Sequence, residues 1–309
     1  MDIKNSVYPS VEVFYSTRML TSEQMVHDRD LAEQYLKILK QAAVRNSPLY
    51  VDGDFVSRGV TMCCANPIGG ILITGINPSF NPKSPYGGYY TFRDAIQDVK
   101  SYWKNKREQL FGDDISMIEK TAYLDLFPYS ESCQKKFQYE IDNNLKLFQN
   151  KYQDEKNVKS FQVSVLEITL SEIERLSPKL IIAANKQTSY YWGIKKDSTW
   201  LGYNLQVVDK SQQPDCLLGK DVELYQIVGE TGYKNGSDRI GQDRYPTTKG
   251  GKSNLLGAYF IDYALYDNRH KEKYPTRILE PSIVKELYNI VENSPIFVRI
   301  DSQASIISP

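Results

Sequence analysis

Three polar side chains are well placed for chemistry because each lies at the end of an apolar segment: Asn77 after residues 71–75, Asp125 within residues 122–127, and Asn185 after residues 179–184. An amide can orient a water molecule or read hydrogen-bonding groups, and a carboxylate can accept hydrogen bonds or act in acid–base catalysis. The alternatives are structural. Asn77 could belong to a plain strand-to-loop turn, since Asn, Pro, Gly and Ser all favour turns. Asp125 could simply cap the turn that follows it.

The elements that must position these residues read as buried strands alternating with helices. Four strands are predicted at residues 71–74, 122–127, 179–184 and 222–228, with a hairpin within residues 199–208. Helices are predicted at residues 21–44, 92–106, 134–152, 158–176 and 283–291, and from residue 255 onward. This alternation favours an α/β fold: a three-layer α/β/α sandwich with a four-stranded, mostly parallel sheet and extra N- and C-terminal helices. We expect a single domain over residues 1–309 with its core at about residues 65–230.

Parallel strands bring their carboxyl ends to one edge of a sheet, which is where α/β proteins usually bind ligands. Asn77, Asp125 and Asn185 should therefore meet at one pocket. Glu230, after the last predicted strand, is a further candidate for this edge.

Composition narrows the classes of function. Lys plus Arg and Asp plus Glu number 38 each, so no net charge draws the chain toward nucleic acid or a membrane. A signal peptide or membrane span would need an apolar stretch that the sequence lacks, so we expect a cytoplasmic protein without a membrane partner. The four cysteines form no Cys-x-x-Cys pair and there are two histidines, so we expect no cofactor, no metal and no iron–sulfur cluster. The oligomeric state is left open.

Two basic segments could contact a polyanion. Residues 248–253 end like a phosphate-binding loop, but Pro246 stands where that motif requires its first glycine. Residues 229–254 as a whole carry five cations against three acids, so Lys249, Lys252 and Ser253 are candidates for contacts with DNA phosphates. Residues 100–107 interleave Tyr102 and Trp103 with cations. That pattern suits single-stranded nucleic acid, but an amphipathic helix with solvated lysines is the favoured interpretation.

Gly75-Ile-Asn-Pro-Ser79 resembles the first motif, Gly-(Ile/Met)-Asn-Pro-Gly, of the uracil-DNA glycosylase superfamily, and most closely that of its mismatch-specific and single-strand-selective branches. The resemblance covers roughly residues 65–230. It continues in order through four further segments: the aromatic-rich Gly88–Phe92, the pair Tyr102-Trp103, Asp125-Leu-Phe-Pro128 in place of Asn-x-x-Pro, and the strand introduced by Pro178-Lys.

This resemblance implies a monofunctional DNA glycosylase that hydrolyses the N-glycosidic bond of a damaged base flipped into the pocket. Asn77 would be catalytic and position the attacking water, and Asp125 would take the place of the amide that reads the base edge. Phe80 or an aromatic among Tyr89, Tyr90 and Phe92 would stack on the base. The remaining implied ligand-binding residues are Gly75, Ile76, Pro78, Ser79, Phe127 and Asn185.

The sequence departs from the family at two functional positions. The second motif of the family is His-Pro-Ser, but residues 229–254 contain no histidine, so a Lys or Ser would have to stabilise the leaving base. An ionised Asp125 only accepts hydrogen bonds, which favours a base that offers an amino group unless burial protonates the carboxylate. The alternative function is therefore a catalytically inactive member of the fold that binds a nucleotide, a modified base or a protein partner.

Overall fold

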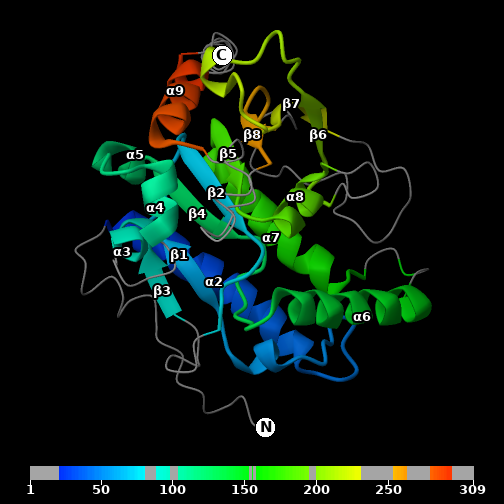
Figure 1. The fold of residues 1–309 in the computed structure, drawn as a ribbon. Coiled ribbons are helices and arrows are strands. Elements are labelled where there is room, and N and C mark those ends of the chain that lie inside the picture. Colours follow the sequence, from blue (N-terminus) through cyan, green and yellow to red (C-terminus); the bar gives the residue numbers. More distant parts are fainter. Residues whose placement is uncertain are drawn as a thin grey trace, which may run out of the picture.

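Helices and strands alternate along the chain around one large mixed sheet (Figure 1). The structure, a computed structural model, describes residues 21–80, 88–97, 104–152, 155, 158–194, 200–230, 253–262 and 279–293. The described helices are α2 (Ser22–Ala42), α3 (Phe92–Gln97), α4 (Lys104–Leu110), α5 (Ile115–Glu119), α6 (Gln134–Tyr152), α7 (Phe161–Leu176), α8 (Lys186–Trp192) and α9 (Pro281–Glu292), with short 3-10 turns at Asp54–Ser57 and Asp215–Leu217. The described strands are β1 (Thr61–Cys64), β2 (Ile71–Gly75), β3 (Gly88–Thr91), β4 (Thr121–Asp125), β5 (Leu180–Ala183), β6 (Tyr203–Val207), β7 (Leu224–Glu230) and β8 (Tyr259–Ile261). The α/β class expected from the sequence is confirmed.

The large sheet contains six strands among the described residues, in the order β4-β2-β5-β8-β7-β6. The four strands β4, β2, β5 and β8 run parallel to one another. Strand β7 runs antiparallel to β8, and β6 runs antiparallel to β7. The expectation of four strands in this sheet is therefore wrong, because the sheet has six among the described residues. The strand predicted at residues 222–228 exists as β7, but it runs antiparallel to β8. The fourth parallel strand is instead β8, in a region for which the sequence predicted a helix.

A second, two-stranded sheet lies beside the large one and is formed by β1 and β3 in parallel. Its register pairs Cys63 with Tyr90. The cysteines of β1 are buried, whereas Tyr90 is partly exposed. Through this small sheet, Tyr90 of β3 lies near the carboxyl end of β2.

Helices cover both faces of the large sheet. On one face, the Phe92 ring of α3 stacks on Tyr123 of β4 with ring centroids 6.1 Å apart. On the other face, Trp192 Nε1 of α8 donates to Thr74 Oγ1 of β2 at 3.2 Å. Thr74 pairs with Leu124, the neighbour of Tyr123, and successive residues of a strand point to opposite faces. Helices α3 and α8 therefore pack on opposite sides of the strands that end at Asn77 and Asp125.

Helices α2 and α7 pack against each other, and each begins with a side-chain cap. Thr21 Oγ1 accepts from Gln24 N at 3.3 Å, and Ser160 Oγ accepts from Val163 N at 3.4 Å. Thr169 of α7 then donates to the carbonyl of Leu126 at 2.9 Å, just beyond the end of β4. This buried hydrogen bond holds the chain after Asp125 against α7, which stabilises the strand end where chemistry was predicted.

Two local predictions differ from the structure. The helix expected over residues 92–106 appears as two separate elements, α3 and α4, with residues 98–103 outside the described part. The hairpin expected within residues 199–208 is absent from the described part of that stretch: β6 is a single strand and pairs with β7. Gly202 does turn, with φ of 75°, but it introduces β6 and does not join two strands.

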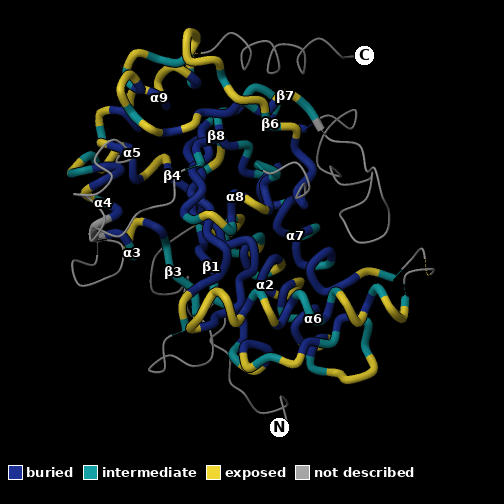
Figure 2. Tube along the Cα trace, turned by 45° about the vertical axis from the view of Figure 1, so that its right-hand side comes forward, coloured by how far each residue is buried: buried dark blue, intermediate teal, exposed yellow. Residues whose placement is uncertain are grey.

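The core follows the large sheet. Every residue of β2 and β4 is buried, as expected for parallel strands covered on both faces. Figure 2 shows a row of exposed residues along α6. Within the described residues, no helix combines the length and the apolar character needed to cross a membrane.

Candidate functional site

A cavity of about 340 Å³ lies at the carboxyl ends of β2 and β4. The two strands end side by side, because Gly75 pairs with Asp125. Among the residues nominated from the sequence, the structure brings eight to the wall of this cavity: Gly75, Ile76, Asn77, Pro78, Ser79, Tyr90, Asp125 and Asn185. The wall also contains Thr61, Ala95, Lys106, Tyr123, Gln134 and Ala184. Its location is the one that the sheet-edge argument predicts.

Asn77 is held by its amide nitrogen, and its amide oxygen is left without a partner. Nδ2 donates to the carbonyls of Pro78 at 3.1 Å and Tyr129 at 3.4 Å. Oδ1 is buried and accepts no hydrogen bond from the described residues. A buried acceptor without a partner is costly and uncommon in a folded protein. The arrangement therefore fixes the orientation of the amide and leaves its oxygen unused by the described residues, although that oxygen is covered from solvent.

Asp125 is a buried carboxyl group next to the cavity. Its side chain is 6% exposed, and Oδ1 accepts a hydrogen bond from the Tyr123 hydroxyl at 2.8 Å. Burial raises the pKa of Asp125 from 3.8 to about 7, while the Tyr123 hydrogen bond and the Lys106 charge act in the opposite direction. Near neutral pH this group can therefore exchange a proton, and it can act as a hydrogen-bond donor or only as an acceptor.

The absence of a side chain at Gly75 makes room for this carboxyl group. A Cβ at Gly75 would collide with the Asp125 carboxylate and with the Tyr123 hydroxyl. The glycine of the Gly-Ile-Asn-Pro segment thus has a structural reason here: it lets two polar side chains of the neighbouring strand lie against the β2 backbone.

Lys106 brings an amine from α4 to the same cavity. It is 6% exposed, and of the described residues that line the cavity it is the only Lys or Arg. Burial lowers the pKa of Lys106 from 10.5 to about 7, and the Asp125 carboxylate acts in the opposite direction. Lys106 and Asp125 therefore influence each other across the cavity, and each changes charge near neutral pH.

Asn185 has a clear structural role at the cavity wall. Its Oδ1 accepts from Thr188 N at 2.9 Å and from Thr188 Oγ1 at 3.0 Å, which caps α8. Such capping stabilises a helix by about 1 kcal/mol. The side chain is partly exposed, so its amide nitrogen can still face a ligand.

Three predicted ligand-binding aromatics lie outside the cavity wall. Phe127 is fully buried in the core, in contact with Phe137 and Tyr191. Phe92 is buried, and its ring stacks on the ring of Tyr123. Phe80 is partly exposed and lies under the Arg58 guanidinium, 3.9 Å from its ring centroid. None of these three rings lines the cavity: Phe92 and Phe127 pack in the core, Phe80 stacks with Arg58, and a contact of any of them with a ligand stays a prediction.

The predicted DNA-contact residues are not gathered at the cavity. Lys249 and Lys252 lie outside the described residues. Ser253 is described, but it is 3% exposed and its Oγ donates to Glu174 Oε1 at 2.6 Å. The hydroxyl of Ser253 is therefore engaged inside the protein, and a contact of this residue with DNA stays a prediction. Its role is to anchor the segment that leads into β8.

Lys106, Tyr123 and Gln134 line the cavity but were not nominated from the sequence. Tyr123 could have been found, because residues i and i+2 of a strand share a face and Asp125 had been nominated. Lys106 gave no such signal. It lies in a lysine-rich segment whose ordinary interpretation is a solvated helix face.

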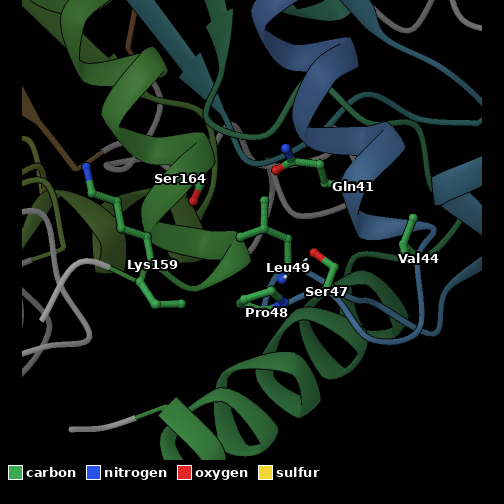
Figure 3. Close-up of a pocket in the computed structure, with 8 residues that line it drawn as sticks. Gln41, Val44, Ser47, Pro48, Leu49, Lys159 and Ser164 are labelled. Carbon is green, nitrogen blue, oxygen red and sulfur yellow. Dashed lines mark hydrogen bonds between the residues drawn. The ribbon is translucent and has the colours of Figure 1, made fainter. Parts of the chain in front are cut away.

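A second cavity of about 470 Å³ lies between the end of α2 and the start of α7 (Figure 3). Two of its polar residues are bonded within the protein: Ser47 Oγ accepts from Leu49 N at 3.1 Å, and Lys159 pairs with Glu167 at 2.6 Å. Unlike the cavity at the strand ends, its wall contains no carboxyl group among the described residues, and its lysine, Lys159, is exposed. We therefore regard the smaller cavity as the candidate site.

The described residues contain no group of three or more His, Cys, Asp or Glu side chains arranged to hold a metal ion. No protein-family model, curated protein or solved structure matches the chain.

Proposed function

We propose that the protein is a DNA glycosylase-like enzyme that hydrolyses the N-glycosidic bond of a damaged base flipped out of DNA. The observation that carries this proposal is the meeting of Asn77, Asp125 and Lys106 at one cavity beside the ends of β2 and β4. The order of motifs along the sequence supports it, since Gly75-Ile-Asn-Pro-Ser79 resembles the first motif of the uracil-DNA glycosylase superfamily. In the proposal, the described sheet corresponds to the central layer of the three-layer glycosylase scaffold, and the enzyme acts in the cytoplasm.

In this mechanism Asn77 Oδ1 accepts a hydrogen bond from a water molecule and aims it at the C1′ carbon of the sugar. As the bond from C1′ to the base breaks, positive charge develops on the sugar and the electron pair passes to the base. Fixed charges and dipoles that stabilise these developing charges lower the barrier. Lys106, in its ammonium form, supplies the positive charge beside the departing base that the family draws from the histidine of its second motif. Asp125 faces the base edge and carries or loses a proton according to the base bound.

A second candidate function is recognition without catalysis. The observation that favours it is the low exposure of Asn77, whose side chain is 8% exposed and whose Oδ1 is covered in the structure. In that case the cavity would bind a nucleotide or a modified base, or a neighbouring surface would bind a protein partner, and Asp125 would determine the specificity.

One experiment separates the two functions. Single-stranded oligonucleotides that each carry uracil, hypoxanthine, xanthine or another damaged base are incubated with the wild-type protein and with Asn77→Ala, and free base is measured. Glycosylase activity predicts base release that depends on Asn77. Binding without release, unchanged in Asn77→Ala and lost in Asp125→Ala, would favour recognition. Release that is equal in the wild type and Asn77→Ala would contradict the proposed mechanism.

A further inference from the structure

Lys106 is a feature of the cavity that the resemblance does not explain. Its amine is carried by α4, yet it is as buried as Asp125 at the end of β4, and both line the same cavity. A lysine side chain is rarely buried to this extent, because an ammonium group in an apolar setting loses its hydration. A buried amine that spends part of its time neutral is the form of lysine that reacts with carbonyl compounds.

We propose that Lys106 is a nucleophile that forms an imine with the aldehyde of an abasic deoxyribose bound in this cavity. This inference rests on the proposed function for its ligand, because an abasic sugar is what remains after a base is released. It does not require that this protein release the base itself, since abasic DNA can also be supplied from elsewhere.

The chemistry balances with the groups present. The neutral Lys106 amine attacks C1′ of the ring-opened sugar, so that a carbon–nitrogen bond forms and the aldehyde oxygen becomes a hydroxyl. Protonation of that hydroxyl by the Asp125 carboxylic acid lets it leave as water, and the nitrogen lone pair forms the iminium. Hydrolysis reverses these steps and restores the amine. No oxidant, reductant or metal enters this sequence.

The reaction needs a neutral amine and a protonated carboxyl group, and Lys106 and Asp125 supply them in the same cavity. Burial lowers the pKa of Lys106 to about 7, so near neutral pH about half of its amines are neutral. An ordinary lysine has a neutral fraction that is about a thousandfold smaller at the same pH. Burial also raises the pKa of Asp125 to about 7, which keeps a proton donor beside the amine. If Lys106 gives its proton to a departing base, it is left in the neutral form that attacks the sugar.

The test is reductive trapping on a single-stranded oligonucleotide with a preformed abasic site. Sodium cyanoborohydride reduces an imine to a stable amine, so a covalent protein–DNA adduct can be seen on a denaturing gel and mapped to a residue by mass spectrometry. The variants are Lys106→Gln, which removes the amine, and Lys106→Arg, which keeps a positive charge without a comparable nucleophile. Lys186→Gln is the matched control, because Lys186 is an exposed lysine next to Asn185 at the cavity wall.

The proposal predicts an adduct at Lys106 in the wild type and in Lys186→Gln, and its loss in both Lys106 variants. Thermal unfolding of each variant shows whether it is folded, and the Arg variant retains the bulk of the side chain. An adduct that persists in Lys106→Gln, that maps to another lysine, or that is absent from the wild type would overturn the proposal. Base release without an adduct would overturn this inference alone, whereas an adduct without base release would count against the proposed glycosylase and leave Lys106 as the reactive amine.

Discussion

The substitution Asp125→Asn should change how the stability of the protein depends on pH. In the folded protein burial raises the pKa of Asp125 from 3.8 to about 7, whereas in the unfolded chain the carboxyl group is solvated. Between pH 4 and pH 6 the folded state therefore keeps a proton that the unfolded state has lost. The stabilisation that this proton linkage provides is complete below the unfolded pKa and is lost as pH rises toward the folded pKa.

The size of this effect follows from the two pKa values. Between pH 4 and pH 6 the folded state holds up to one proton more than the unfolded state. A difference of one proton changes the unfolding free energy by about 1.4 kcal/mol per pH unit, so over these two units the wild type should lose roughly 2 to 3 kcal/mol of stability through this group. Lys106 does not obscure the measurement in this range. Burial lowers its pKa only to about 7, so the amine is protonated in both states below pH 6.

The assay is urea unfolding of the wild type and Asp125→Asn at pH 4, 5 and 6. Asparagine keeps an oxygen that can accept from the Tyr123 hydroxyl, but it does not titrate. The difference in unfolding free energy between the two proteins should shift in favour of the variant by roughly 2 to 3 kcal/mol from pH 4 to pH 6. Every other acidic group contributes equally to both proteins. A difference that stays constant with pH would refute the reasoning that burial dominates at Asp125.

Two further substitutions test how the site and its surroundings are held. Gly75→Ala should destabilise the protein by about 2 to 4 kcal/mol in urea unfolding, because the new Cβ displaces the buried Asp125 carboxyl group; an unchanged midpoint would contradict the close approach. Glu174→Gln should cost about 2 to 3 kcal/mol, since Oε1 of the buried carboxylate accepts from the Tyr203 hydroxyl at 2.7 Å and from Ser253 Oγ at 2.6 Å while Oε2 accepts from Asn254 N at 2.7 Å, and an amide nitrogen cannot replace the second acceptor. Tyr203→Phe removes only one of these bonds and should cost less than Glu174→Gln, so an equal or larger loss would argue against the shared role of the carboxylate.

The main strands and the position of the site could be predicted from the sequence because the signals are local. Residues 71–75 and 121–125 are short apolar runs that end at polar turns, and parallel strands with such runs must place their ends at one edge. The runs alone therefore predict that Asn77 and Asp125 meet, and both line the cavity at that edge. The cap at Thr21 is likewise a local signal, and α2 begins directly after it.

The parts that sequence reasoning missed depend on contacts between distant segments. Strand β8 is three residues long, too short to show the alternation of a strand, and only its pairing between β5 and β7 makes it one. Lys106 is buried in the folded protein, and nothing in the sequence of residues 100–107 distinguishes it from the other cations of that segment. Phe92 and Phe127 were assigned to the ligand because aromatic residues near a site can stack on a base, and in the structure both are buried and neither lines the cavity.

The measurement that tests the account most directly is the single-turnover rate of base release by the wild type, by Asn77→Ala and by Asn204→Ala. Asn204 is an exposed asparagine on β6, at the opposite edge of the sheet from β4, so its loss is a matched control. If Asn77 positions the attacking water, Asn77→Ala should slow release by about 100-fold while Asn204→Ala leaves the rate unchanged. Release by the wild type that Asn77→Ala retains in full, or no release from any damaged base, would contradict the account.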